Sequence, residues 1–310
     1  MKKYSLLLMI LVLLTITGCG SQGFTGGPNG VQINFILDGF PIDQNTKLPS
    51  IPQGSPPTVK LTLTNNAACD VSGKLWLDDS IQGGIEKPIS QNLDLYGESL
   101  VNNKLEIDHK DFLFGANQIP AYQNIPNFQS EVTLIATAVY SCSINTGPQL
   151  CIKKESASNS IICANSETIT GSKLNAASAP VTLTEIRKSY YADPSGGTKL
   201  HLDITLSKMS DGRVSNTAAL QDPFTLESVK EEDSVNVEVE YANIPMECSD
   251  KNKHFKDGKL SFGTKPEDSE RTINCEVLVT DFKEFSQDQL NVKLDFIYKI
   301  TKTQNILITS

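Results

Sequence analysis

An apolar residue at every second position is the pattern that most constrains the fold of this chain. Apolar and polar side chains alternate in four separate segments, namely 31–37, 59–64, 200–206 and 235–241. Successive side chains of a β-strand point to opposite faces of its sheet, so this pattern predicts half-buried antiparallel strands. Turn-forming residues fill the gaps, as at 193–197 and at Asp257-Gly258. Beyond the N-terminal segment no stretch has the periodicity of an amphipathic helix, and the chain is predicted to be all-β.

Two of the predicted strands resemble each other. Residues 132–140 and 290–298 both carry an apolar side chain at every second position, and both end in a tyrosine. After a short turn, the apolar pattern of 149–152 matches that of 304–307. Two copies that end alike predict two modules of one architecture. The segment from Asn165 onward is rich in Ser, Thr, Ala and Asn, and the predicted division is a module at 31–165, a linker at 166–179 and a module at 180–310.

The N-terminus has the order of features typical of a secretory signal. Lys2 and Lys3 precede an apolar run at 6–16, which ends in Ile16-Thr17-Gly18-Cys19. The run is shorter than the roughly 20 residues that a membrane-spanning helix needs. Residues 1–18 are therefore predicted to be a cleaved signal peptide.

The sequence Ile-Thr-Gly-Cys resembles the lipobox of prokaryotic lipoproteins. The resemblance implies that Cys19 is lipidated and becomes the mature N-terminus, which places the protein on a membrane, facing outward. Two or more acyl chains would hold it firmly, whereas a single chain gives marginal binding. Residues 19–30 are rich in glycine and are predicted to be a flexible tether, which spans on the order of 20 Å.

Length and charge limit the remaining possibilities. Removal of residues 1–18 leaves about 292 of the 310 residues, which favours two domains. The formal net charge of −9 becomes −11 without Lys2 and Lys3. A chain without a basic surplus is not expected to bind nucleic acid. The acidity is interpreted as a solubility feature, not as a site for a specific cationic partner.

The cysteine count predicts disulfides. Seven cysteines become six once Cys19 is lipidated, and an even number in an exported protein points to paired thiols. None of the six is spaced as Cys-x-x-Cys, so a redox or zinc site is not expected. Six cysteines allow many pairings, and the sequence alone does not select one. Local spacing favours Cys151 with Cys163 and Cys248 with Cys275, which leaves Cys69 with Cys142.

Several motifs resemble those of immunoglobulin-type domains. Tyr140-Ser141-Cys142 resembles their tyrosine corner, and the order Cys69, Trp76, Cys142 is similar to their Cys, Trp, Cys order, although Trp76 follows Cys69 by only seven residues. Residues 58–79 are similar to adhesion-related sandwich repeats of prokaryotic surface proteins. The layout from Val31 onward resembles that of uncharacterised prokaryotic surface lipoproteins, archaeal ones above all. The resemblance implies two tandem immunoglobulin-like antiparallel β-sandwiches and a cell-surface setting, and it implies no activity.

Candidate catalytic residues are few. His109, His201 and His254 lie on separate segments, and His201 is expected on the polar side of a strand. Residues 108–111, Asp-His-Lys-Asp, contain an acid–base pair, but no nucleophile motif such as Gly-x-Ser-x-Gly accompanies them. The sequence therefore predicts a protein that is not an enzyme.

Metal and cofactor sites are not predicted, apart from a weak case for Ca²⁺. Asp250-Lys-Asn252-Lys-His254 begins like a calcium loop but lacks the glycine and the final carboxylate of such loops, which favours a turn. The acidic clusters at 231–233 and 267–270 precede predicted strands and are interpreted as solvated loop charge.

Trp76 is the sole tryptophan, flanked by Leu75 and Leu77. An exposed aromatic ring there would be a candidate ligand contact, because it would stack on sugars. Aromatic side chains bury a large apolar area, so a core position is favoured.

The hypothesis favoured by these features is a membrane-anchored cell-surface lipoprotein that acts as a non-enzymatic binding or adhesion module. Its partner would be an envelope protein or a glycan. A structural subunit of an envelope or surface assembly is the alternative, and a hydrolase is a remote one.

Overall fold

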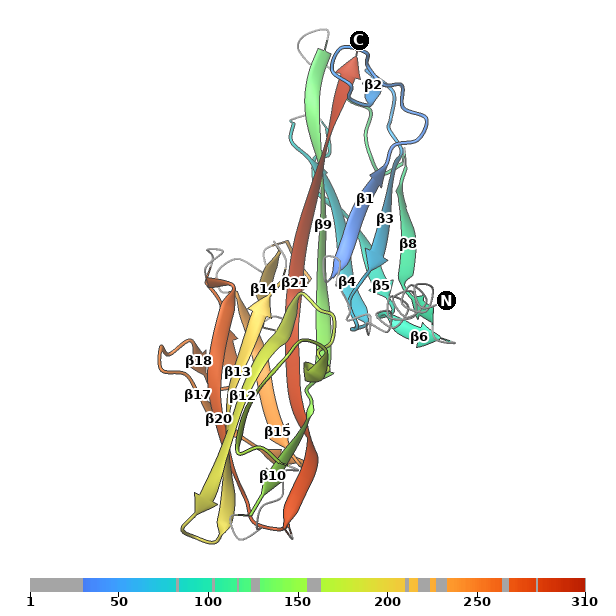
Figure 1. Ribbon diagram of the computed structural model, residues 1–310. Helices are drawn as coiled ribbons and strands as arrows, with labels where there is room; N and C mark the ends of the chain where they lie inside the picture. The colour runs from blue at the N-terminus through green and yellow to red at the C-terminus, as the bar shows by residue number, and fades with distance from the viewer. Residues whose placement is uncertain are drawn as a thin grey trace, which may run out of the picture.

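The computed structural model describes residues 30–81, 84–101, 104–115, 117–123, 129–154, 163–209, 212–216, 224–226, 233–263, 268–282 and 284–309. These residues form an elongated molecule of two lobes, built almost entirely from β-strands (Figure 1). The upper lobe contains the C-terminus and the lower lobe contains β10 to β20. The all-β, antiparallel prediction is confirmed.

Each lobe contributes one sheet of its own. The upper sheet has the order β1-β3-β8, with β1 at Val31–Ile36, β3 at Val59–Asn65 and β8 at Asp108–Phe114. The lower sheet has the order β11-β12-β13-β20-β17, with β11 at Ser166–Thr170, β12 at Val181–Asp193, β13 at Gly197–Lys208, β20 at Glu270–Val279 and β17 at Glu247–Ser249.

A third sheet of eleven strands runs through both lobes. Its main path is β18 (Phe255–Lys256), β19 (Lys259–Ser261), β15 (Ser234–Tyr241), β21 (Phe285–Thr309), β9 (Gln129–Thr146), β4 (Val71–Asp79) and β5 (Ile89–Leu95). Four further strands pair with this path, namely β2 (Ser50–Pro52), β10 (Gln149–Lys153), β14 (Arg213–Ser215) and β16 (Ile244–Pro245). A separate hairpin is formed by β6 (Ser99–Val101) and β7 (Lys104–Glu106), and η1 (Gly171–Leu174) is a short 3-10 helix.

The predicted alternation is confirmed by burial. In β3, Val59, Leu61 and Leu63 are buried while the residues between them are half-buried, and β13 and β15 show the same alternation over most of their length. Buried side chains from all three sheets form one hydrophobic core that continues through both lobes. This arrangement is that of an all-β sandwich.

The two longest strands connect the lobes. β9 pairs with β21 in antiparallel register over all 18 of its residues, from Gln129 opposite Thr309 to Thr146 opposite Val292. In Figure 1 this ribbon passes along the centre of the molecule from the top of the upper lobe into the lower lobe. The last residues of β21 also pair with β2 of the upper lobe, whereas its first residues pair with β10.

Strand pairing therefore crosses the predicted domain boundaries. Residues 303–309, assigned from sequence to the second module, pair with 129–135 of the first. The segment 166–179, predicted to be a linker, instead forms β11, which pairs with β12, and η1. Burial of Ile169 and Leu174 explains why this polar segment is ordered against the lower sheet.

The repeated strands pair with each other at their tyrosines. Tyr140 of β9 lies opposite Tyr298 of β21, and the ring centroids are 5.6 Å apart. Both rings are buried, and each hydroxyl accepts a hydrogen bond from a backbone N–H, that of Val31 at 3.1 Å and that of Gly212 at 2.7 Å. A side chain at Gly212 would overlap the Tyr298 ring, since a Cβ there would lie 2.2 Å from it. The two paired tyrosines thus have equivalent burial and each accepts one backbone hydrogen bond.

Three disulfides connect the described cysteines. They join Cys69 to Cys142, Cys151 to Cys163 and Cys248 to Cys275. The last two are the pairs favoured by local spacing, and Cys69–Cys142 is the pair that they leave. Their sequence separations are 73, 12 and 27 residues.

Candidate binding groove

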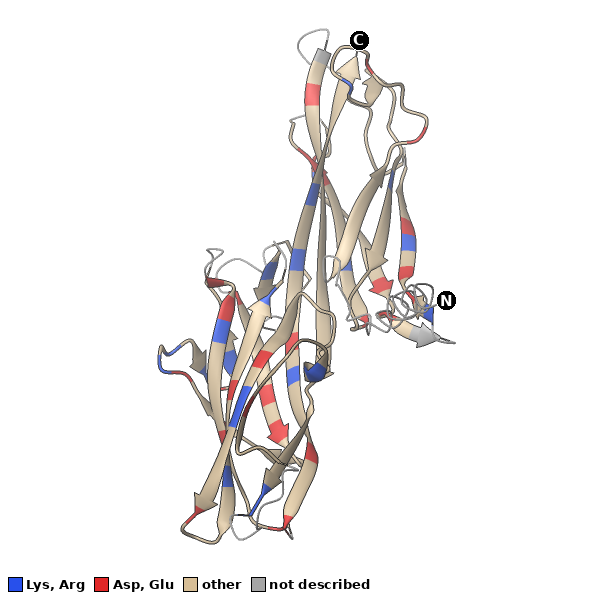
Figure 2. Ribbon diagram, viewed as in Figure 1, with Lys and Arg blue, Asp and Glu red and all other residues tan. Residues whose placement is uncertain are grey.

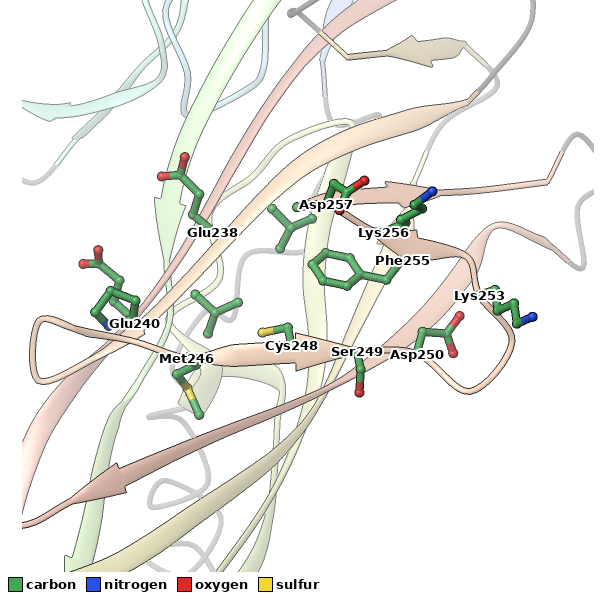
Figure 3. A pocket seen from close by; sticks show the side chains of 14 residues that line it. Glu238, Glu240, Met246, Cys248, Ser249, Asp250, Lys253, Phe255, Lys256 and Asp257 are labelled. Carbon is green, nitrogen blue, oxygen red and sulfur yellow. The ribbon is translucent and has the colours of Figure 1, made fainter.

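A groove of about 850 Å³ opens on the lower lobe (Figure 3). All its lining residues come from one continuous stretch, 237–258. This stretch leaves the shared sheet after β15 and β16, joins the lower sheet as β17, and returns to the shared sheet as β18. The groove lies where the chain crosses between the two sheets, because β17 and β18 are too short to close the sandwich there.

The floor of the groove is apolar. Val237 and Val239 of β15 face the core of the lobe and are 3% and 5% exposed. Met246, Cys248 and Phe255 complete the floor, and Figure 3 shows Phe255 and Cys248 between the strands. An apolar surface of this kind favours contact with apolar groups over contact with water.

Charged residues of both signs line the groove. Asp250, Lys253, Lys256 and Asp257 lie on one side, whereas Glu238 and Glu240 belong to the β15 side and their carboxylates point away from the groove (Figure 3). Glu238 is paired with Lys293, at 3.4 Å between Oε2 and Nζ. A rim of mixed charge around an apolar floor is the arrangement of a surface that binds a partner with both apolar and polar groups.

The turn at 250–254, whose sequence begins like a calcium loop, forms one wall of the groove. Asp250 accepts hydrogen bonds from the backbone N–H groups of Asn252 at 3.1 Å and His254 at 2.9 Å. Lys253 has a φ of 63°, in the left-handed region. The Asp250 carboxylate therefore stabilises the turn in which it lies, and the sequence also favours a turn here over a calcium loop.

The Cys248–Cys275 disulfide holds the groove to the lower sheet. The two cysteines are directly opposite each other in the register of β17 and β20, with Cα atoms 4.0 Å apart. Since β17 has only three residues, few backbone hydrogen bonds hold it to β20. The covalent bond fixes β17, and with it Met246 and Cys248, in position.

Trp76 lies on the opposite face of the shared sheet from the main core. Its neighbours Leu75 and Leu77 are in that core, whereas Trp76 packs with Val139, Ile297 and Phe224. The indole N–H donates to the carbonyl oxygen of Phe224 at 3.2 Å. The ring is half-buried in this small cluster and does not pack on the Cys69–Cys142 disulfide, whose Cys142 faces the main core.

The carboxylates of the Asp-His-Lys-Asp segment on β8 make structural contacts. Asp108 accepts a hydrogen bond from the backbone N–H of Tyr96 at 2.9 Å. Asp111 pairs with Lys60 at 2.8 Å and accepts from the Thr62 hydroxyl at 2.6 Å. The hydrogen bonds from Lys60 and Thr62 lower the pKa of the Asp111 carboxyl. His109 is exposed on the same strand.

His201 has two carboxylate neighbours on the outer face of the lower sheet. Its Nδ1 lies 3.2 Å from Glu276 and its Nε2 lies 3.2 Å from Asp203. Glu276 also pairs with Lys199, whose hydrogen bond lowers the pKa of the Glu276 carboxyl. His201 is thus half-buried and has partners, where the sequence predicted a plain exposed residue. Among the described residues, no group of His, Cys, Asp and Glu side chains is arranged to hold a metal ion.

One member of the predicted acidic clusters is not solvated. The side chain of Asp233 is fully buried, and its carboxylate lies 3.0 Å from Lys208 Nζ and 3.0 Å from Arg213 Nε. It also accepts from the backbone N–H of Val214 at 2.9 Å. The interpretation of residue 233 as solvated loop charge is therefore wrong, because the end of β13 and the start of β14 supply cations that the local sequence does not reveal. Asp268 does carry partly exposed charge, paired with Arg271 at 3.0 Å.

The signal peptide, Cys19 and the tether up to residue 29 lie outside the described residues, as do Glu231, Glu232 and Glu267. In the described part of the chain, no helix has the length and apolar character needed to cross a membrane. No protein-family model matches this chain, and no curated protein matches its sequence. The groove at 237–258 could not be predicted from the sequence. Its residues are consecutive, but its walls belong to strands of two different sheets, and the sequence does not show which sheet each strand joins.

Proposed function

We propose that this chain is a cell-surface lipoprotein, held on the outer face of a membrane by a lipid on Cys19, that binds an envelope protein or a glycan without catalysing a reaction. The observation that carries the binding part of the proposal is the groove at 237–258. Its floor is apolar and its rim is charged. The disulfide at its base keeps the surface preformed, which lowers the entropy cost of binding.

The anchored part of the proposal is supported by the sequence before residue 20. Mass spectrometry of the protein extracted from its native membrane without reduction tests it directly. A diacylglyceryl or related lipid on Cys19, with the other six cysteines paired, is the expected result. An unmodified Cys19 would refute the anchor.

The binding part is tested with two matched substitutions of partly exposed phenylalanines. Phe255 lines the groove, whereas Phe285 begins β21 at the other end of the lower lobe and is 49% exposed. Binding of the purified protein to isolated envelope fractions should be lost in Phe255→Asp and kept in Phe285→Asp. Equal binding by both variants would show that the groove is not the site.

The alternative of a structural subunit makes a different prediction for the same experiment. Its supporting observation is the continuous pairing of β9 with β21, which runs through both lobes. A structural subunit would be extracted in a complex of fixed stoichiometry, and Phe255→Asp would leave that complex intact.

A further inference from the structure

The segment between β5 and β8 exposes three apolar side chains at one end of the upper lobe. Tyr96 is 76% exposed, Leu105 is 42% exposed and Ile107 is 39% exposed. Leu105 belongs to β7 of the β6–β7 hairpin, and the other two residues flank that hairpin. In Figure 1 the hairpin projects from the side of the molecule, away from the lower lobe.

The base of this segment is fixed to the lobe by hydrogen bonds at Tyr96. Its backbone N–H donates to the Asp108 carboxylate at 2.9 Å, and its carbonyl oxygen accepts from the buried side chain of Asn65 at 2.9 Å. The next backbone N–H, that of Gly97, donates to Asp70 at 2.8 Å. The Tyr96 side chain is thereby held outward at a defined place.

The same end of the lobe is where the N-terminal tether begins. Val31 lies opposite Asn65 in the pairing of β1 with β3, and Asn65 lies opposite Asp108 in the pairing of β3 with β8. Adjacent strands are about 4.8 Å apart, so Val31 and Asp108 are about 10 Å apart across the sheet. A tether that spans on the order of 20 Å keeps the exposed segment within reach of the surface to which Cys19 is attached.

We propose that Tyr96, Leu105 and Ile107 form a membrane-docking surface that inserts into the bilayer beneath the lipid anchor. This inference rests on the proposed lipidation of Cys19. Tyrosine favours the membrane–water interface, and leucine and isoleucine bury well at the boundary of headgroups and acyl chains. Three such side chains bind weakly alone, but a tether raises their effective concentration at the bilayer.

The charges around the surface indicate which bilayer it fits. The segment itself carries Glu98 and Glu106 against Lys104, and Asp108 and Asp70 accept hydrogen bonds from its backbone at Tyr96 and Gly97. Figure 2 shows acidic residues on the strands next to this hairpin. Docking by basic residues favours anionic lipids, whereas an acidic surround is repelled by them. The proposed surface therefore docks through apolar contact and favours zwitterionic or neutral lipid.

The test uses the full mature, lipidated chain in phosphatidylcholine vesicles. The single tryptophan is moved to the surface by combining Trp76→Phe with Tyr96→Trp. The matched control combines Trp76→Phe with Tyr191→Trp, since Tyr191 is 51% exposed on β12 of the lower lobe. Docking predicts that the Tyr96→Trp protein has blue-shifted emission that brominated acyl chains quench, and that the control does not.

The outcomes separate the docking from the anchor. Vesicle flotation reports whether the chain is anchored at all; failure to float would refute the anchored function and the docking with it. A protein that floats but shows equal quenching at both positions would refute the docking alone. That result would also be expected if the exposed side chains contacted another protein in place of the bilayer.

Hydrogen exchange on the unsubstituted lipidated chain gives an independent check. Docking predicts slower exchange of residues 96–107 on phosphatidylcholine vesicles, and a loss of that protection when anionic lipid is added. The double variant Leu105→Asp, Ile107→Asp should remove the protection while flotation persists. Protection that is unchanged in this variant would refute the proposed surface.

Discussion

Replacement of Asp233 by alanine should destabilise the lower lobe more than removal of any exposed carboxylate in the part of the chain described by the structure. The Asp233 carboxylate is fully buried between Lys208 and Arg213, and it accepts the hydrogen bond of the Val214 N–H. It therefore connects the end of β13 in the lower sheet to β14 in the shared sheet.

The expected loss in free energy of unfolding follows from the groups that Asp233→Ala leaves without a partner. Removal of one partner from a buried ion pair costs about 3–5 kcal/mol. The Lys208 side chain is 12% exposed and that of Arg213 is 40% exposed, so both cations regain some water and the lower end of that range applies. The buried N–H of Val214 also loses its acceptor, which supports a value of at least about 3 kcal/mol.

Urea unfolding of the oxidised protein, followed by circular dichroism, measures this loss. Asp268→Ala is the matched control, because Asp268 pairs with Arg271 while its side chain remains 37% exposed. Exposed pairs contribute less than about 1 kcal/mol. A difference between the two variants of less than about 1 kcal/mol would show that the buried network does not stabilise the lobe in the way argued.

Three other predictions concern the core and the surface. Tyr140→Phe and Tyr298→Phe should each lower the free energy of unfolding by about 1–3 kcal/mol, because each leaves one buried backbone N–H without its acceptor; unchanged stability of either variant in urea unfolding would contradict the role of its hydroxyl. Lys60→Met should raise the pKa of Asp111 in an NMR titration, because the hydrogen bond from Lys60 is the largest cause that lowers it. The lowered pKa stabilises the folded protein at pH values above the ordinary pKa of Asp, and this stabilisation is lost as the pH falls through the pKa of the folded state. An unchanged pKa would exclude Lys60 as the cause. Removal of the Cys69–Cys142 disulfide, which spans 73 residues, should lower the free energy of unfolding by roughly 4 kcal/mol. Removal of Cys151–Cys163, which spans 12 residues, should lower it by roughly 3 kcal/mol. A larger loss for the shorter loop in urea unfolding would contradict the loop-entropy argument.

The strands could be predicted from the sequence because their signal is local. Alternation at 59–64 or 235–241 reports which side chains face a core, and burial follows it. The partner of each strand has no such local signal. The likeness of 132–140 to 290–298 was visible, but the sequence does not reveal that these two strands lie side by side with Tyr140 opposite Tyr298. Tandem modules were the simpler interpretation of a repeat.

The candidate site was harder to predict than the fold. The groove depends on where the chain passes from one sheet to the other, and Val237 and Val239 look in sequence like ordinary core residues. The burial of Asp233 has no local signal, because its partners, Lys208 and Arg213, come from other strands. The disulfides are the exception: Cys151–Cys163 and Cys248–Cys275 have short separations that favour pairing, and they leave Cys69–Cys142 as the third pair.

The shared ribbon of β9 and β21 also determines the order in which the chain can complete its fold. Gln129 pairs with Thr309, and more than half of the sequence separates them. Contacts of such separation form slowly, and until β21 arrives one side of β9 is an unpaired strand edge on which other chains can add. We therefore expect the newly made chain to remain aggregation-prone until synthesis reaches residues 300–309, and to need protection from a chaperone until that last strand is in place.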